Sequence, residues 1–230
     1  MARYAVVIIN YNSHKYLAPQ IIRLRKYIKL NEGDNLDIIV GDNSRNGKAI
    51  AKNQETCNKH GVIYIKYHFT EGDYSSHHAL ALNAILLEYK NNFNSILLID
   101  HDIFLFDYSD IFLRTSDKHF AGLAQNKIGK TYLHPGIMLV NLELTREVNF
   151  DFTPCEHMDT GGKMADLIQS SNIEYLWIKY SEYSVNGNVD FYEIIDNVWM
   201  HFIKGSNWNK NKNHVERIKY LTSELEKISK

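Results

Sequence analysis

The stretch Tyr4-Ala5-Val6-Val7-Ile8-Ile9-Asn10-Tyr11-Asn12 decides the fold, because an apolar, β-branched run ends in a polar cluster and a helical pattern over Ser13–Tyr27 follows. Such a short apolar run is typical of a buried strand. The same order of strand and helix recurs along the first hundred residues, with strands expected over Leu36–Val40, Val62–Tyr67 and Ser95–Ile99 and helices over Lys48–His60 and Ser75–Tyr89. Strands that alternate with helices predict right-handed crossovers and a largely parallel sheet, so the fold class is α/β.

Cap residues agree with this alternation. Ser13 and Ser75 stand at the starts of two expected helices, where a side-chain oxygen can accept from the first backbone N–H groups. Gly61 follows the second expected helix, at a position where a residue with positive φ commonly ends a helix. We therefore expect Ser13 and Ser75 to cap their helices and Gly61 to end one.

The pattern changes after about residue 105. Strands are expected over Phe120–Ala124, Gly136–Leu142 and Glu174–Tyr180, a hairpin over Ser184–Asp196 around Asn186-Gly187, and a helix after Asp159-Thr160-Gly161-Gly162. Val215–Ile228 is expected to form an amphipathic C-terminal helix that packs on the body of the protein. Because no repeat, low-complexity segment or linker interrupts the chain, we expect a single domain over residues 1–230.

The composition narrows the class of protein. The chain has 230 residues, 44% of them hydrophobic, and its 26 Lys and Arg against 27 Asp and Glu disfavour general binding to nucleic acid. The longest apolar runs, Ala5–Ile9 and Ile96–Ile99, are far shorter than the ~20 residues of a transmembrane helix, and the N-terminus lacks the apolar segment of a secretory signal. Cys57 and Cys155 are expected to be free thiols in a cytoplasmic protein. The oligomeric state is left open.

Three polar clusters follow expected strands: Asn10-Tyr11-Asn12, Gly41-Asp42-Asn43-Ser44 and Asp100-His101-Asp102. Ligands of open parallel sheets bind at the carboxyl ends of the strands, so these clusters are expected to converge on one edge. Each cluster taken alone is also ordinary turn chemistry. Their joint placement favours a ligand site.

The third cluster is the most specific. The buried-strand run Ser95–Ile99 delivers two carboxylates, Asp100 and Asp102, separated by one residue, so both can face one hard cation. Carboxylates completed by waters and diphosphate oxygens commonly hold Mg²⁺ or Mn²⁺ beside a nucleotide. Asp-x-Asp triplets also occur by chance, and the position directly after an apolar strand is what supports a metal site here.

These three segments resemble, in order and spacing, the nucleotide-sugar half of GT-A-fold glycosyltransferases, particularly the family 2 type, over roughly residues 4 to 105. The resemblance implies a Rossmann-like GT-A domain, with a nucleotide-sugar-binding half over 1–105, an acceptor half over 106–208 and a C-terminal helix over 209–230. It also implies that Asn10 and Tyr11 lie against the base, that Asp42, with Asn43 beside it, bonds the base or ribose, and that Asp100 and Asp102 hold the ribose and the metal-bound diphosphate.

Ser75–Asn83 stands where the family commonly has a polar helix start over the diphosphate, and a helix N-terminus favours negative charge. This segment contains the neighbours His77 and His78. Adjacent helical residues point in different directions and no second Cys or His pair stands at zinc spacing, so zinc is disfavoured. We expect one histidine of the pair, taken as His78, to face the donor.

Two stretches of the second half also resemble GT-A enzymes. His134–Asn141 is similar to the strand that floors the acceptor site in several families, and His201–Trp208 resembles a C-terminal segment of family 8 enzymes. In family 8 the corresponding histidine is the third metal ligand, which implies that role for His201, although Gly205 stands one position later than in that family and no Lys-Pro precedes Trp208. Lys204 could neutralise the leaving diphosphate. The alternative is that His201 is a buried member of an aromatic cluster.

Inverting transfer needs a general base near the acceptor hydroxyl. Family 2 enzymes place an acidic residue just before a helix that follows the acceptor strand, and the matching region is Glu156–Gly162. Asp159 is the first candidate and Glu156 the second, with His157 also possible. The alternative for Asp159 is to cap the helix expected after it.

The resemblance implies a glycosyltransferase that uses Mn²⁺ or Mg²⁺ and moves a sugar from a nucleoside diphosphate donor, UDP-linked by expectation, to a hydroxyl of a glycan, protein or small molecule. The family 2 features suggest inversion of configuration, whereas the family 8 features suggest retention. A sugar-nucleotide nucleotidyltransferase is an alternative that would normally carry a Gly-rich basic loop after the first strand. A non-catalytic glycan- or nucleotide-binding module of the same fold is another.

Overall fold

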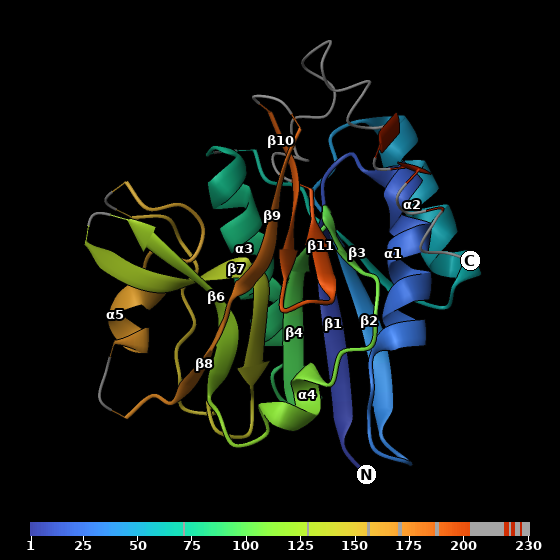
Figure 1. The fold of residues 1–230 in the computed structure, drawn as a ribbon. Helices are drawn as coiled ribbons and strands as arrows, with labels where there is room; N and C mark the ends of the chain where they lie inside the picture. The colour runs from blue at the N-terminus through green and yellow to red at the C-terminus, as the bar shows by residue number, and fades with distance from the viewer. Residues whose placement is uncertain are drawn as a thin grey trace.

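The structure is a computed structural model that describes residues 1–70, 72–127, 129–155, 157–169, 172–186, 189–202, 219–220, 222–223 and 226, with the backbone alone for 182–186 and 189–191 (Figure 1). Two sheets form its frame. Within the described part, none of the helices has the length and apolar character needed to cross a membrane.

The large sheet has seven strands in the order β3-β2-β1-β4-β7-β6-β8. Their bounds are β1 Arg3–Asn10, β2 Asn35–Asp42, β3 Ile63–Lys66, β4 Ser95–Asp100, β6 Phe120–Lys127, β7 Lys130–Asn141 and β8 Tyr175–Ile178. β1, β2, β3 and β4 pair in parallel, β7 runs antiparallel to both β4 and β6, and β8 is parallel to β6. The expected mostly parallel α/β sheet is therefore confirmed.

Helices cover both faces of the large sheet (Figure 1). Their bounds are α1 His14–Tyr27, α2 Gly47–Lys59, α3 Tyr74–Tyr89, α4 Ile111–Arg114 and α5 Met164–Ile168. Residues of α1, α2 and α4 pack into the hydrophobic cluster on one face, and residues of α3 and α5 into the cluster on the other. α1 and α2 lie on one face of the sheet and α3, which connects β3 to β4, lies on the other. The strands from β1 to β3 are added toward one edge of the sheet, and β4 is added on the opposite side of β1.

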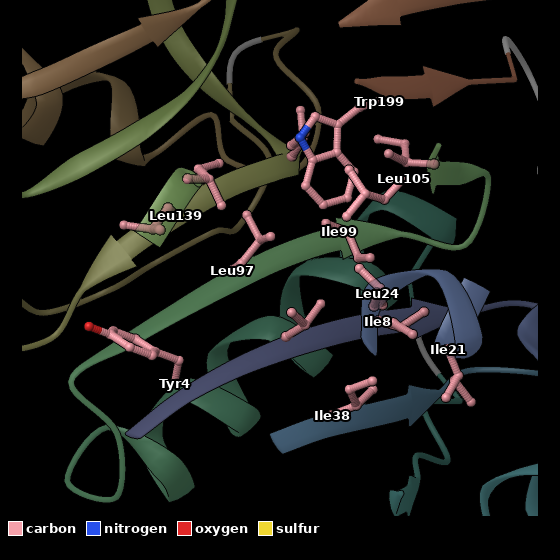
Figure 2. Close-up of a cluster of buried hydrophobic side chains, with 14 of the residues drawn as sticks. Tyr4, Ile8, Ile21, Leu24, Ile38, Leu97, Ile99, Leu105, Leu139 and Trp199 are labelled. Atoms are coloured by element: carbon pink, nitrogen blue, oxygen red, sulfur yellow. The ribbon is translucent and has the colours of Figure 1, made fainter. Parts of the chain in front are cut away.

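Alternate residues of the central strands enter opposite clusters. On β4, Leu97 and Ile99 join the cluster beneath α1, whereas Ile96 and Leu98 join the cluster beneath α3. Figure 2 shows the first cluster, in which Trp199 lies against strand and helix side chains. Burial of both faces explains why these strands read as continuous apolar runs.

A second, antiparallel sheet of four strands has the order β5-β11-β10-β9. Its bounds are β5 Ile103–Leu105, β9 Tyr180–Asn186, β10 Val189–Ile195 and β11 Trp199–His201. The hairpin expected over Ser184–Asp196 is present as β9 and β10, but it starts earlier, at Tyr180. The strand expected over Glu174–Tyr180 is present but shorter, as β8 over Tyr175–Ile178, and Tyr180 already belongs to β9 of the other sheet.

Two cap predictions are wrong and one is confirmed. Ser13 occupies the N-cap of α1, yet its hydroxyl bonds to Asn10 and caps no N–H group. Asp73, and not Ser75, is the N-cap of α3, where its carboxylate accepts from the N–H of Ser76. Gly61 has a φ of +57° just after α2, as expected for a residue that ends a helix.

Both cysteines are free thiols, as expected. Cys57 lies in the core, where burial raises its pKa to about 12, so the thiol is not a nucleophile at neutral pH. Most of the helix expected over Val215–Ile228 lies outside the described residues. Tyr220, which is described, stacks on Tyr192 of β10 with ring centroids 5.8 Å apart.

Candidate active site

The strand order places a site between β1 and β4. Strands are added in one direction from β1 to β3, and β4 then returns to the other side of β1. Ligands of α/β proteins bind at the carboxyl ends of the strands at such a switch point. A cavity of about 250 Å³ opens there, lined by Ile9, Tyr11, Asn43, Tyr74, Ser75, His77, His78, Asp100, His101, Asp102 and Thr160. All three predicted polar clusters thus meet around one cavity.

Asn10 and Asp42, two predicted donor-binding residues, are not among the residues that line the cavity. Both are fully buried, at 0% exposure. The Oδ1 of Asn10 accepts from Ser13, and its Nδ2 donates to Asn53 at 3.2 Å. The two carboxylate oxygens of Asp42 accept from the Ser44 N–H at 2.8 Å and the Tyr64 hydroxyl at 2.7 Å. Their side chains therefore hold the loops in place within the protein.

Tyr11 and Asn43 do line the cavity. The Nδ2 of Asn43 donates to the carbonyl of His77 at 3.2 Å, and its buried Oδ1 has no hydrogen-bond partner among the described residues. A buried acceptor without a donor costs free energy, so the Oδ1 of Asn43 is available to a donor group of a ligand or to a water in the cavity. Asn43 and His77 also border a second cavity of about 290 Å³, which Lys66 and Tyr67 help to line.

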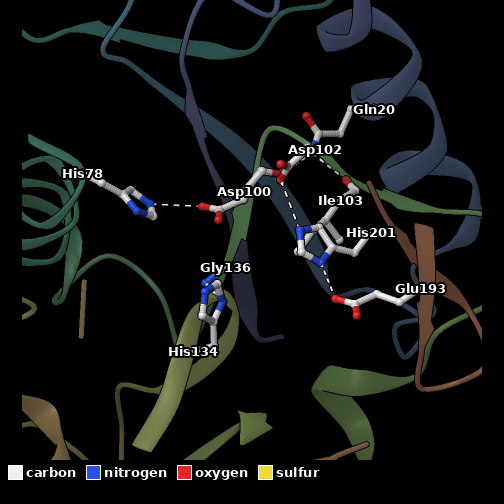
Figure 3. Close-up of polar contacts among 9 residues, drawn as sticks. All are labelled: Gln20, His78, Asp100, Asp102, Ile103, His134, Gly136, Glu193 and His201. Carbon is white, nitrogen blue, oxygen red and sulfur yellow. Dashed lines mark hydrogen bonds and ion pairs between the residues drawn. The ribbon is translucent and has the colours of Figure 1, made fainter. Parts of the chain in front are cut away.

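Asp100 and Asp102 occupy the ends of a tight turn and face different histidines (Figure 3). The Oδ1 of Asp100 lies 3.1 Å from the Nε2 of His78, which α3 supplies. Burial opposes ionisation of Asp100, but the charge and hydrogen bond of His78 outweigh it and hold the pKa of this carboxyl far below its ordinary value. His78, which was predicted to face the donor, contacts Asp100 in this structure.

Gln20 fixes this turn from α1. Its side chain is 1% exposed, and its Nε2 donates to the carbonyls of Asp100 at 2.8 Å and Ile103 at 2.7 Å. The two bonds join the last residue of β4 to the first of β5 (Figure 3). The segment that carries Asp102 is therefore held at both ends.

Asp102 faces the C-terminal strand β11. Its Oδ1 is buried, has no hydrogen-bond partner among the described residues, and lies 3.8 Å from the Nε2 of His201. The Nδ1 of His201 is 2.6 Å from the Oε1 of Glu193, which is 6% exposed. Burial opposes the charged form of His201, but Glu193 and Asp102 outweigh it and raise the pKa of this imidazole.

The three predicted metal ligands are only partly brought together. Among the described residues, no group of three or more His, Cys, Asp and Glu side chains is arranged to hold a metal ion. Asp102 and His201 face each other, whereas Asp100 faces His78 (Figure 3). Of the aromatic residues predicted as the alternative surroundings of His201, Trp199 and Phe202 are buried in two different hydrophobic clusters, and Trp208 lies outside the described residues.

His134 lies beside Asp100, at the middle of β7 (Figure 3). Its Nδ1 accepts from the N–H of Gly136 at 3.0 Å. Burial lowers the pKa of His134, so the ring is neutral and carries its proton on Nε2, where it can donate but not act as a base. This is the segment predicted to floor the acceptor side.

We expect Gly136→Ala to damage the site directly. A Cβ at Gly136 would stand 2.5 Å from the Cε1 of His134 and 2.8 Å from the Oδ2 of Asp100, so these side chains would have to shift from their present positions. Overpacking of this kind costs ~1–3 kcal/mol of stability. We expect the melting temperature to fall and nucleotide binding, measured by calorimetry, to be lost.

Gly47→Ala is the matched control for this substitution. Gly47 starts α2 and has nothing within 4 Å of an added Cβ, so its replacement should leave both stability and binding intact. Unchanged nucleotide binding in Gly136→Ala would show that the contact between His134 and Asp100 is not part of the site.

The start of α3 borders the cavity, as expected for the polar segment Ser75–Asn83. Its helix N-terminus is not a free anion site, however, because the carboxylate of Asp73 already accepts from the first turn. Of the histidine pair, both members line the cavity: His78 meets Asp100, and the buried His77 accepts from the Nη2 of Arg45 at 3.1 Å. The expectation that one histidine of the pair, taken as His78, faces the donor stays a prediction.

Asp159 occupies the loop before α5 and caps no helix. The N-cap of α5 is Lys163, so the capping alternative for Asp159 is wrong. Its carboxylate is paired with the Nζ of Lys127, and its side chain is 43% exposed. The next residue, Thr160, lines the cavity and donates to the carbonyl of Ser75 at 3.0 Å, so Asp159 lies at the edge of the site. His157 is exposed in the same loop.

Glu156 and Lys204, the second candidate base and the predicted diphosphate contact, lie outside the described residues. Gln20, Tyr74, Thr160 and Glu193 are among the residues of the site that were not predicted. Gln20 and Glu193 are buried polar residues at apolar positions of their elements, and this is the signal that could have identified them.

Solved structures of glycosyltransferases share this fold. The mannosyltransferase PcManGT from Pyrobaculum calidifontis, in complex with GDP-Man and Mn²⁺, matches with a TM-score of 0.58 at 12% identity, over 76% of this chain and 54% of that one. TarS of S. aureus matches with a TM-score of 0.51 at 15% identity, over 77% and 35%. A TarS fragment in complex with UDP matches with a TM-score of 0.50 at 14% identity, over 76% and 57%.

These likenesses define the class: the chain has the GT-A fold of glycosyltransferases. It spans about half the length of PcManGT and about a third of TarS. No protein-family profile matches the sequence, and neither does any curated protein. At these identities the comparison establishes the fold, and the resemblances to family 2 and family 8 stay predictions.

Proposed function

We propose that the protein is a metal-dependent glycosyltransferase that moves a sugar from a nucleoside diphosphate sugar, UDP-linked by expectation, to an acceptor hydroxyl. One observation carries this proposal. The buried Oδ1 of Asp102 has no partner among the described residues and lies 3.8 Å from the Nε2 of His201, at the switch point of a GT-A sheet. PcManGT, which has this fold, binds GDP-Man and Mn²⁺.

Two of the three predicted ligands, Asp102 and His201, are spaced to share a divalent cation. Ligands stand about 2.1 Å from Mg²⁺ or Zn²⁺, so two ligands of one ion lie at most ~4 Å apart. The 3.8 Å between Asp102 and His201 satisfies this limit. We assign Asp102 and His201 as ligands and keep Asp100 as the third, although its carboxylate contacts His78 in this structure. Carboxylate and imidazole ligands suit Mn²⁺ or Mg²⁺.

The nucleoside is assigned to the cavity and its neighbour beside β2 and β3. Tyr11 offers an aromatic face, and the unpartnered Oδ1 of Asn43 offers an acceptor. Asp42 was expected to bond the base or ribose, but both of its carboxylate oxygens accept hydrogen bonds within the protein. We therefore assign the polar contact with the nucleoside to Asn43. Asn10 supports the loop.

The transfer itself needs charge stabilisation on the leaving diphosphate and a base for the acceptor. A bound divalent cation supplies the first, by neutralising charge that develops on the leaving group. Asp159 is the proposed base, at the rim next to Thr160. Glu156 is retained as the second candidate, and Lys204 as a contact of the diphosphate.

A nucleotidyltransferase is not favoured, because the sequence after β1 has no Gly-rich basic loop. The loop at that position contains Asn12 instead, whose Oδ1 accepts from the backbone N–H groups of Arg45 and Asn46. A binding module without activity would keep the fold but would have no need for the unpartnered carboxylate of Asp102. Hydrolysis of a nucleotide sugar in the presence of Mn²⁺ separates a transferase from such a module.

Thermal stabilisation by nucleotides tests the donor site. A ligand at about a hundredfold excess over its Kd stabilises the native state by ~2.7 kcal/mol, which corresponds to roughly 5–10 °C for a chain of this length. We expect UDP, or else GDP or CMP, to raise the melting temperature with Mn²⁺ and to have little effect with EDTA. If none of the three nucleotides shifts melting with Mn²⁺ or Mg²⁺, the proposed donor site is wrong.

A further inference from the structure

On the face of the small sheet that packs against the core, one set of cross-strand neighbours is apolar and the next set includes two polar residues. Side chains directly opposite one another on neighbouring strands share a face. Trp199 and its two cross-strand neighbours are buried members of the main core cluster. The next row sets Glu193 of β10 opposite His201 of β11, and His201 opposite Ile103 of β5. The small sheet thus brings Glu193 and His201 beside the turn that carries Asp102.

Glu193 is a buried carboxylate on a face that is otherwise part of the core. It is 6% exposed, and burial of a charge is costly unless the charge is paired. Its partner is His201, whose Nδ1 lies 2.6 Å from the Oε1 of Glu193. An ionised carboxylate can only accept a hydrogen bond, so Nδ1 of His201 carries the hydrogen. The Nε2 is the atom that is left to face Asp102, at 3.8 Å.

We infer that Glu193 is a positioning residue, which fixes the ring orientation and the Nδ1–H tautomer of His201 so that Nε2 presents its lone pair toward the divalent cation shared with Asp102. The inference rests on the proposed metal-dependent function. Glu193 contacts the Nδ1 of His201 and does not line the described cavity, so its proposed effect on the cation is exerted through His201. Histidine ligands of metals are commonly oriented by such a carboxylate partner.

A purely structural role makes a different prediction. If Glu193 only balanced the buried imidazole, its removal would lower the stability of the fold but leave the tautomer and the cation affinity of the folded protein unchanged. Readouts of tautomer and affinity therefore separate the two roles, whereas loss of activity alone would not.

The test compares Glu193→Gln and Glu193→Ala with the wild-type protein. Mn²⁺ affinity is measured from the electron paramagnetic resonance signal of free Mn²⁺, and loss of an outer-shell partner typically weakens metal binding ~10- to 100-fold. We expect that loss in Glu193→Ala and a smaller one in Glu193→Gln, because the amide oxygen of glutamine still accepts from Nδ1–H. Should Glu193→Ala fail to fold, Glu193→Gln keeps the shape and carries the test.

Nitrogen-15 spectra of the histidine rings in the metal-free protein give the second readout. At alkaline pH we expect His201 to be the Nδ1–H tautomer in the wild type and a mixture of the two tautomers in the Glu193 variants. The resonances of His201 are assigned by their absence from the spectrum of His201→Asn. Glu143→Gln is the control, because Glu143 accepts from Asn94 at 2.8 Å at the opposite end of β4.

The possible outcomes distinguish the inference from the proposed function. Wild-type Mn²⁺ affinity in both Glu193 variants, or an Nε2–H tautomer of His201 in the wild type, overturns the positioning role while the transferase proposal stands. A wild-type protein that does not bind Mn²⁺ overturns the metal-dependent function instead, and the tautomer of His201 then decides alone whether Glu193 positions the ring.

Discussion

Asp102→Ala is expected to abolish metal-dependent turnover of a nucleotide sugar while the protein remains folded. A catalytic metal contributes several kcal/mol to transition-state stabilisation, and each 1.36 kcal/mol is a factor of ten in rate. We therefore expect a loss of at least ~100-fold in the hydrolysis or transfer rate, measured by release of the nucleoside diphosphate. The shift in melting temperature that a nucleotide gives with Mn²⁺ should disappear as well.

The fold should tolerate this substitution. The Oδ1 of Asp102 has no hydrogen-bond partner among the described residues, so its removal takes away an unsatisfied buried acceptor. The backbone carbonyl of Asp102, which accepts from the N–H of Phe202 at 2.9 Å, is unaffected. Asp37→Ala, which removes an exposed carboxylate paired with Arg3, is the control and should keep full activity. Full metal-dependent turnover in Asp102→Ala would exclude Asp102 as a ligand.

The large sheet could be predicted because its signals are local. Each of β1, β2 and β4 is a short apolar run followed by a helix or a polar turn, and burial on both faces makes such runs continuous. The small sheet could not be predicted in the same way. β5 and β11 have three residues each, too few to show a period, and their pairing joins Ile103 to His201 across the second half of the chain.

The location of the site could be predicted from the sequence, but the side chains that line it could be predicted only in part. Sheet topology fixes which strand ends meet, so the clusters after β1, β2 and β4 converge as expected. Which member of a cluster turns inward depends on partners elsewhere: Asp42 turns toward Tyr64 of β3, and its neighbour Asn43 is left to line the cavity. Those partners become visible only when the fold is known.

His201 shows the same limit from the other side. The sequence around His201 was enough to suggest a metal ligand. Its partner Glu193 lies eight residues earlier in the chain, and the two side chains are brought together only by the register of β10 and β11. A single glutamate between Tyr192 and Ile194 was a weak signal in the sequence, because exposed strands alternate in the same way.

Asp159→Asn is expected to lower transfer to an acceptor by ~10²- to 10⁴-fold, the usual contribution of a general base, and to leave nucleotide binding unchanged. The structure poses one objection, because Lys127 occupies both carboxylate oxygens of Asp159. That pair is partly exposed, with side-chain exposures of 33% for Lys127 and 43% for Asp159. Breaking such a surface ion pair costs at most ~1 kcal/mol, so an acceptor can displace the lysine at little expense.

Lys127→Met tests this argument as the matched partner. Without the lysine, both carboxylate oxygens of Asp159 are free to accept a hydrogen bond from an acceptor hydroxyl. We expect Lys127→Met to retain transfer within about tenfold of the wild type, while Asp159→Asn loses it, with transfer measured as glycosylated acceptor and nucleotide binding by calorimetry. Transfer that survives in Asp159→Asn would mean that the base lies elsewhere, as at Glu156, or that the reaction retains configuration and needs no base at this position.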